Sequence, residues 1–119
     1  MQIINKEKPV FTISIHQNSY VTPKAEGAQV FYYKKSEESK RIAQIMQGIL
    51  GEKLGTTRQI KSDVNYYILL HSKLPTIISE CGFLSNPEEE QRLCTEEYQE
   101  KVADALYCGI IEYLMMNMK

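Results

Sequence analysis

The sequence lacks a strong excess of charge of one sign, and this absence limits the partners that its surface favours. Its 119 residues include 14 Lys and Arg and 15 Asp and Glu, for a formal net charge of −1. Proteins that bind nucleic acid or anionic lipid electrostatically carry clustered basic residues and a basic isoelectric point. We therefore expect no nucleic-acid partner and no electrostatic attachment to a membrane surface.

Long apolar segments are also absent. No stretch reaches the roughly 18 consecutive apolar residues of a membrane-spanning helix, so we expect no membrane span. The first residues, Met-Gln-Ile-Ile-Asn-Lys, are too polar for a secretory signal peptide. The three cysteines lack the spacing of a metal site, which favours reduced and mainly buried thiols: Cys81, Cys94 and Cys108.

The composition that is present is that of one ordinary globular domain. Hydrophobic residues make up 43% of the chain and charged residues 24%. A chain of this length can build one hydrophobic core. No internal repeat or low-complexity segment divides it, so we treat residues 1–119 as a single domain.

A strictly alternating segment near the N-terminus predicts a strand that ends on an ionisable side chain. In residues 10–16, apolar and polar positions alternate with period two, as in a strand with one buried face. One face carries Phe11, Ile13 and Ile15, and the other carries Thr12, Ser14 and His16. His16 stands at the carboxyl end of this strand, directly before the turn-forming residues 17–19.

Two further short segments are assigned to strands. Residues 30–33 predict a strand at a sheet edge, with Lys34 and Lys35 as charges that protect the edge from further pairing. Residues 66–70 are apolar at every position, and the run is too short for periodicity to separate a strand from a helical turn. We assign residues 66–70 to a strand.

Two longer segments have the apolar periodicity of helices. Ser36 caps the first helix, acidic residues follow in its first turn, and Gly55 ends it. Its apolar stripe recurs at steps of three and four residues: Ile42, Ile45, Met46, Ile49, Leu50 and Leu54. Thr95 caps a last helix, whose stripe is Tyr98, Val102, Ala105, Leu106, Gly109, Ile110 and Tyr113.

The segment 75–87 is the one around which the chain is organised. It starts with a β-branched apolar run that suits a buried strand, and this strand ends on the carboxylate of Glu80. Gly82 breaks the strand, and Asn86-Pro87 opens a short helix in which Glu89 is placed to complete a capping box. A strand-end carboxylate lies where open α/β sheets form their ligand crevice. The alternative is a side chain that simply faces water.

His16 and Glu80, each at a strand end, are the candidate site residues. Together they could bind a metal ion, or act as a base and its orienting partner. The alternative is that His16 is an ordinary surface residue, and His71, before a turn, suits a structural role. Cys81 follows Glu80 in an extended strand and so points to the other face. A hydrolase built on Cys81 and His16 is a third alternative.

Two blocks of the sequence resemble a known enzyme family. Residues 14–19 (Ser-Ile-His-Gln-Asn-Ser) and 75–87 (Pro-Thr-Ile-Ile-Ser-Glu-Cys-Gly-Phe-Leu-Ser-Asn-Pro) are similar to the two downstream signature blocks of the zinc-dependent N-acetylmuramoyl-L-alanine amidases. The stretch between the blocks and the last helix also fit, so the likeness covers nearly the whole chain. The sporulation and germination amidases are the most similar type.

The resemblance implies a fold, a cofactor and a reaction. The fold is an α/β domain with a twisted, mostly parallel sheet flanked by helices on both faces. The reaction is the hydrolysis of the amide between N-acetylmuramic acid and L-alanine in peptidoglycan, dependent on one Zn²⁺, in the cell wall or outside the cell. His16 matches the second histidine ligand of the zinc, and Glu80 matches the glutamate that acts as general acid/base. No residue is assigned to substrate binding.

The sequence departs from the family in its metal ligands. The family's first histidine ligand and its glutamate ligand lie upstream of the block at 14–19. Only 13 residues precede Ser14, and they contain no histidine and a single glutamate, Glu7, onto which we carry no ligand role. We therefore expect residues 1–119 to be the C-terminal two-thirds of an amidase domain, incomplete at the N-terminus. An incomplete zinc site predicts that the chain alone is inactive.

The alternative function is that of a non-catalytic module of the same fold, which self-associates or binds a partner. The alternating strand at 11–16 is expected to be central in the sheet, and its missing neighbours would leave unpaired backbone groups. This favours a homo-oligomer formed through the exposed sheet edge. Between His16 and Glu80 we expect an open crevice with no zinc or a weakly held one.

Overall fold

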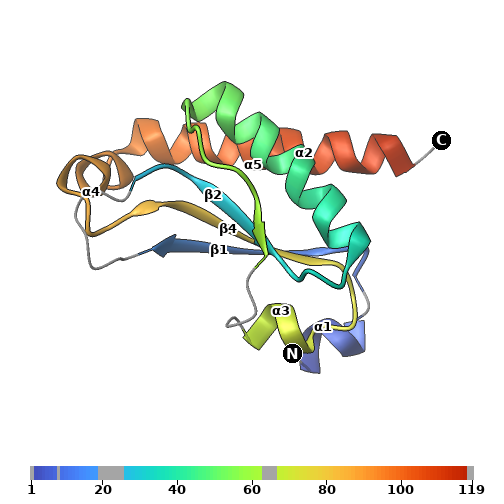
Figure 1. The fold of residues 1–119 in the computed structure, drawn as a ribbon. Coiled ribbons are helices and arrows are strands. Elements are labelled where there is room, and N and C mark those ends of the chain that lie inside the picture. Colours follow the sequence, from blue (N-terminus) through green and yellow to red (C-terminus); the bar gives the residue numbers. More distant parts are fainter. Residues whose placement is uncertain (1, 8, 19–25, 63–66, 118–119) are drawn as a thin grey trace.

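The computed structural model describes residues 2–7, 9–18, 26–62 and 67–117 of the chain. In order, the elements are α1 (Gln2–Glu7), β1 (Thr12–Asn18), β2 (Gln29–Tyr32), α2 (Glu37–Leu54), β3 (Lys61–Ser62), α3 (Tyr67–His71), β4 (Thr76–Phe83), α4 (Pro87–Leu93) and α5 (Glu96–Asn117) (Figure 1). None of the described helices is long and apolar enough to cross a bilayer.

The strands form one mixed sheet in the order β1-β4-β2-β3. β1 runs parallel to β4, and β2 runs parallel to β3, whereas β2 and β4 are antiparallel. The predicted α/β fold, with a sheet flanked by helices, is confirmed, and its one antiparallel pairing makes the sheet mixed. Every residue of β4 is buried, as expected from segment 75–87, but β4 continues through Gly82 to Phe83 and does not end at Glu80 as predicted.

Among the described residues β1 pairs with β4 alone and lies at one end of the sheet, as expected for a strand whose other neighbours are missing from residues 1–119. The position of β2 differs from the prediction. β2 lies between β4 and the short β3, so it is not an edge strand. Alternation reports which face of a strand is buried, but it does not report how many neighbours the strand has. The central strand is β4.

α2 and α5 cover one face of the sheet, and their apolar stripes form the main core (Figure 1). A Cβ added at Gly109 of α5 would lie 2.5 Å from the sulfur of Met46 on α2. Because Met46 is only 1% exposed, a larger residue at Gly109 would require the Met46 side chain to move. The predicted stripe of α2 is confirmed at its buried members: Ile42, Met46, Ile49 and Leu50.

The ends of α2 are those that the sequence predicts. The Ser36 hydroxyl accepts a hydrogen bond from the Ser39 N–H at 3.1 Å, which satisfies one of the free donors of the first turn. At the other end, Gly55 adopts a left-handed conformation with φ 76°, and its N–H donates to the carbonyl of Gly51. Glycine tolerates this conformation without a steric cost.

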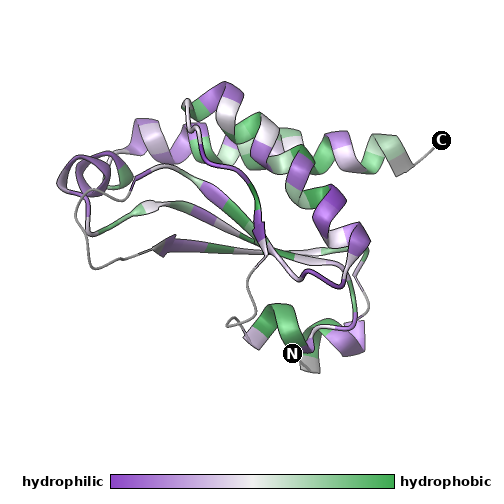
Figure 2. Cartoon of the chain, viewed as in Figure 1, coloured by the Kyte–Doolittle hydropathy of each residue, from purple (hydrophilic) through white to green (hydrophobic). Residues whose placement is uncertain are grey.

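α3 packs against the opposite face of the sheet, and α1 lies beside α3 (Figure 1). α3 corrects the strand predicted at 66–70, of which Tyr66 lies outside the described residues. Leu69 is buried against Phe31 and Ile78, whereas Tyr67 is 66% exposed, so one side of a helical turn faces the sheet. The middle of α3 is coloured hydrophobic in Figure 2, and so short an apolar run cannot distinguish a strand from a helical turn.

Candidate active site

The two residues singled out from the sequence are direct neighbours in the sheet. His16 on β1 and Glu80 on β4 are register partners in the parallel pair. On the other side of β4, Gln29 on β2 is the antiparallel partner of Glu80. Register partners project to the same face of a sheet. His16, Glu80 and Gln29 therefore form one row of polar side chains across three adjacent strands.

Glu80 and His16 differ in their exposure to solvent. Glu80 is 1% exposed, on the same face of β4 as the buried Ile78, whereas His16 is exposed near the carboxyl end of the edge strand β1. The Ser14 hydroxyl lies 2.8 Å from Nε2 of His16, two residues back on the same face. This hydrogen bond restrains the orientation of the imidazole ring.

The donor set of the described residues does not amount to a catalytic zinc site. A catalytic zinc takes three protein ligands and leaves one position open. His16 and Glu80 offer one imidazole and one carboxylate, and no group of three or more His, Cys, Asp and Glu side chains suited to a metal occurs among the described residues. Glu7 is exposed in α1. The residues present therefore do not hold a three-ligand zinc by themselves.

Cys81 is separated from this row by the pleat of β4. Its side chain lies in the core beneath α2 and α5, whereas Glu80 points to the other face. Burial, with a smaller contribution from the Glu80 charge, raises the pKa of the Cys81 thiol to about 11. The thiol stays protonated at neutral pH and is turned away from His16, so the geometry disfavours a cysteine hydrolase.

His71 has the structural role that its position suggests. It lies at the end of α3, where its ring stacks on that of Tyr67 with a centroid separation of 4.1 Å. Its carbonyl accepts a hydrogen bond from the Asn5 amide at 3.4 Å, which joins α1 to α3. His71 precedes β4 in the chain and is not part of the row of His16 and Glu80.

Glu89 has a different role from the one predicted. The Asn86 side chain caps α4 by accepting from the backbone N–H of Glu88 and of Glu89, as expected. The Glu89 carboxylate does not return to Asn86 to complete a capping box. Its Oε1 accepts from the N–H of Gly27 at 2.9 Å and of Phe83 at 3.1 Å. No local sequence pattern signals this contact, because Gly27 is far away in the chain.

These two bonds connect the end of β4 to the segment that leads into β2. Glu89 is 4% exposed, and a Cβ at Gly82 would lie 3.3 Å from its second carboxylate oxygen, so glycine leaves room for the buried side chain. Burial, and then the Glu89 charge, raise the pKa of the neighbouring Tyr98 phenol. The Tyr98 hydroxyl donates to the carbonyl of Cys81 at 3.1 Å. Glu89 thus helps to hold the strands that carry Glu80 and Gln29.

Replacing Glu89 by alanine is expected to destabilise the chain by about 2–4 kcal/mol, because two largely buried N–H groups lose a charged acceptor. Glu89→Gln retains one carbonyl acceptor and should cost less. Urea unfolding followed by circular dichroism measures the difference. Glu88→Ala is the matched control, since Glu88 is exposed on the same helix. Equal midpoints for Glu88→Ala and Glu89→Ala would contradict the role of the two bonds.

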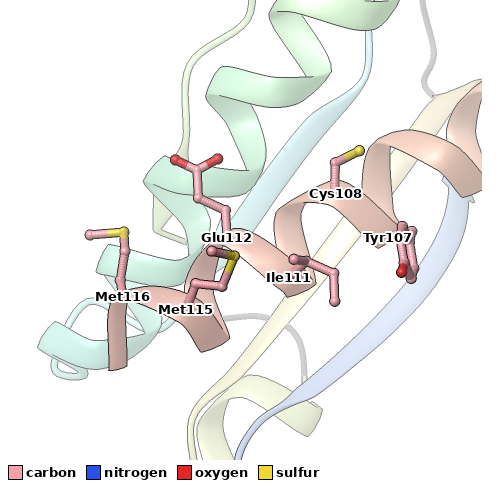
Figure 3. Close-up of a pocket in the computed structure, with 6 residues that line it drawn as sticks. All are labelled: Tyr107, Cys108, Ile111, Glu112, Met115 and Met116. Carbon is pink, nitrogen blue, oxygen red and sulfur yellow. The ribbon is translucent and has the colours of Figure 1, made fainter. Parts of the chain in front are cut away.

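Two prominent cavities lie away from the row. The first, of about 440 Å³, is mainly apolar, and all its lining side chains project from α5: Tyr107, Cys108, Ile111, Glu112, Met115 and Met116 (Figure 3). The second, of about 330 Å³, is more polar and lies beside Gly27, Glu89 and Tyr98. Neither is lined by His16 or Glu80, so the crevice expected between these residues is not one of these cavities.

Comparison with known proteins identifies the family. The family model described as N-acetylmuramoyl-L-alanine amidase (Amidase_3) matches residues 1–112. The germination-specific N-acetylmuramoyl-L-alanine amidase of Bacillus subtilis is 39% identical over 95% of this chain and 48% of that protein. An uncharacterised B. subtilis protein, YqiI, is 34% identical over 85% of this chain and 50% of its own length. The chain thus spans about half the length of the curated relatives it matches.

Solved structures agree with the sequence relatives. The CwlD amidase of Clostridioides difficile, solved in complex with the GerS lipoprotein, superposes with a TM-score of 0.91 at 37% identity, covering 97% of this chain and 59% of that one. An N-acetylmuramoyl-L-alanine amidase of Clostridium difficile 630 gives a TM-score of 0.88 at 32% identity, over 94% of this chain and 61% of that one. This chain belongs to the N-acetylmuramoyl-L-alanine amidase family.

Proposed function

We propose that this chain forms the part of an amidase domain that carries the general acid/base, Glu80. The reaction is the hydrolysis of the amide between N-acetylmuramic acid and L-alanine in peptidoglycan. The observation that supports the proposal is the register of β1 and β4, which places His16 and Glu80 side by side on one face of the sheet. Two segments distant in sequence converge there, as an active site requires.

The role proposed for Glu80 is proton transfer. Its carboxylate takes a proton from water as the water oxygen bonds to the amide carbonyl carbon, and it delivers a proton to the nitrogen of L-alanine as the C–N bond breaks. A rigid position supports this role, because an acid/base group must lie within hydrogen-bond reach of the reacting atoms. β4 provides this rigidity, since it is buried along its length and paired on both sides.

We further propose that the complete domain depends on zinc, with His16 as one ligand. Zinc in such sites acts as a Lewis acid and lowers the pKa of bound water. Because the described residues do not supply three ligands, zinc dependence requires ligands that they do not include. The donor chemistry of His16, an exposed imidazole restrained by a hydroxyl, suits a zinc ligand.

The relatives suggest the biological setting. The B. subtilis relative is named for germination, and other matched proteins are named as cell wall amidases. We propose peptidoglycan of the cell wall as the substrate, a location in the wall or outside the cell, and a role in sporulation or germination. The GerS lipoprotein is a partner of the C. difficile CwlD amidase. We propose that this protein has an equivalent partner.

Digestion of purified peptidoglycan tests the proposal. The 119-residue chain is compared with a chimera in which the B. subtilis relative supplies the portion that this chain does not match. The chimera should release stem peptides from N-acetylmuramic acid, detected by mass spectrometry, and lose this activity on chelation until zinc is returned. A well-folded chimera that binds zinc but releases no stem peptide would contradict the proposed reaction.

The second candidate is a non-catalytic module that self-associates. It is favoured by the single pairing of β1 among the described residues and by exposed apolar side chains on α5. Tyr107, Ile111 and Met115 are 63%, 37% and 62% exposed. Sedimentation velocity over a range of concentrations distinguishes the candidates: a stable dimer of the chain without activity in the chimera would favour the module.

A further inference from the structure

A cationic side chain lies at the end of the row that contains Glu80. Gln29, the β2 partner of Glu80, accepts a hydrogen bond at its Oε1 from Nη1 of Arg58 at 3.0 Å. The Gln29 amide nitrogen donates to the carbonyl of Gln59 at 2.7 Å. These two contacts fix the orientation of the amide.

Arg58 is itself held in place from two further directions. Its Nε donates to the carbonyl of Glu26 at 2.5 Å. Its guanidinium lies over the ring of the buried Phe83, 4.8 Å from the ring centroid, so that the aromatic face supports the cation. Fixing an arginine side chain costs much of its rotamer entropy, and in Arg58 these contacts have already fixed it. The guanidinium is therefore preorganised at the end of β4.

Arg58 forms no ion pair with the carboxylates of the described residues. Its printed hydrogen bonds use Nε and Nη1 and go to a carbonyl and an amide oxygen, both uncharged. A guanidinium has five N–H donors in a planar fork that matches a carboxylate. A half-buried arginine with donors in reserve beside a catalytic row is suited to an anionic ligand.

From this geometry we propose that Arg58, oriented by Gln29, forms a subsite that binds a carboxylate of the peptide portion of the substrate. This inference rests on the proposed function, which places the scissile amide at Glu80. Neighbouring strands are spaced by about 4.8 Å, and one residue of an extended peptide spans about 3.5 Å. A bound peptide that runs from the scissile bond at Glu80 across β4 and β2 brings its next one or two residues to Gln29 and Arg58. The guanidinium then pairs with their free carboxylate.

Binding of two matched ligands to the 119-residue chain tests the subsite without requiring turnover. The probes are N-acetylmuramoyl-L-alanyl-D-glutamic acid γ-methylamide, whose α-carboxylate is free, and the same compound with that carboxylate converted to an amide. Isothermal titration calorimetry should show that the acid binds about 10- to 100-fold more tightly, as expected for a charge-assisted pair. Arg58→Gln should abolish this preference, and Arg58→Lys should retain part of it.

Arg41→Gln is the matched control, because it removes the same charge from α2, and it should keep the preference for the acid. Thermal unfolding verifies that each variant is folded. If Arg58→Gln is unfolded, Arg58→Lys takes its place in the comparison. Equal affinity of the wild type for both probes would overturn the subsite while leaving the proposed function intact. Binding of neither probe would overturn the subsite, whereas the proposed function is tested separately by peptide release from the chimera. A preference for the acid that survives Arg58→Gln and Arg58→Lys would show that another group recognises the carboxylate.

Discussion

Replacing Glu80 by glutamine is expected to lower the amidase activity of the complete domain by about 10²–10⁴-fold, the contribution typical of a general acid/base. Glutamine has nearly the same shape and keeps a hydrogen-bonding carbonyl, but it cannot accept and return a proton. Because Glu80 is 1% exposed within a fully buried strand, the change should act on chemistry and not on access to solvent. Peptide release by the chimera with the B. subtilis relative measures the loss.

The stability of the variant distinguishes a catalytic from a structural role. Glu80→Gln should keep the melting temperature of the parent within a few degrees, since a buried charge is replaced by a neutral group of equal size. Glu90→Gln, an exposed carboxylate on α4, is the control and should keep full activity. Undiminished peptide release by Glu80→Gln would remove Glu80 from the mechanism.

The largest effect on stability is expected from Met46→Asp, which should unfold the chain. Met46 lies on α2 and is 1% exposed in the main core, where its sulfur lies against Gly109 of α5. A carboxylate at this position has no cationic partner in the apolar stripe, and burying such a group costs several kcal/mol, comparable with the total stability of a small domain. Far-ultraviolet circular dichroism and urea titration report the loss of structure.

Two neighbouring positions provide graded controls for Met46→Asp. Gln44→Asp adds the same group on the exposed side of α2 and should change stability by about 0.5 kcal/mol or less. Ile45→Asp should lie between the two, because Ile45 is only partly buried at the margin of the stripe. A Met46→Asp protein that unfolds at the same urea concentration as Gln44→Asp would show that the α2–α5 contact is not essential.

The elements that could be predicted from sequence are those with long periodic patterns or explicit end signals. The alternation at 11–16 and the stripe between Ser36 and Gly55 each contain enough positions to define one buried face. α3 could not be predicted, because its apolar run is shorter than two helical turns. The place of β1 at one end of the sheet depends on pairings among distant segments, which no local pattern encodes.

The residues of the candidate site also divide into those that the sequence could predict and those that it could not. Glu80 was found because a carboxylate follows a β-branched run, and the resemblance to the amidases then gave it a role that remains a prediction. The structure adds that His16 and Glu80 are register partners. Gln29 and Arg58 carry no signal in the sequence, since their relation to Glu80 appears only once β2 is known to pair antiparallel to β4. The contact of Glu89 with Gly27 was hidden for the same reason.

The central position of β4 has a consequence for the order of folding. β4 follows most of the chain, yet it must pair with β1 on one side and β2 on the other before the sheet exists. Each pairing closes a long loop, and the chain loses conformational entropy before the stabilising contacts form. α2 can form early from local contacts, whereas the row of His16, Glu80 and Gln29 is assembled only when three distant segments meet. Alignment of this row should therefore be among the last events of folding and should accompany formation of the sheet itself.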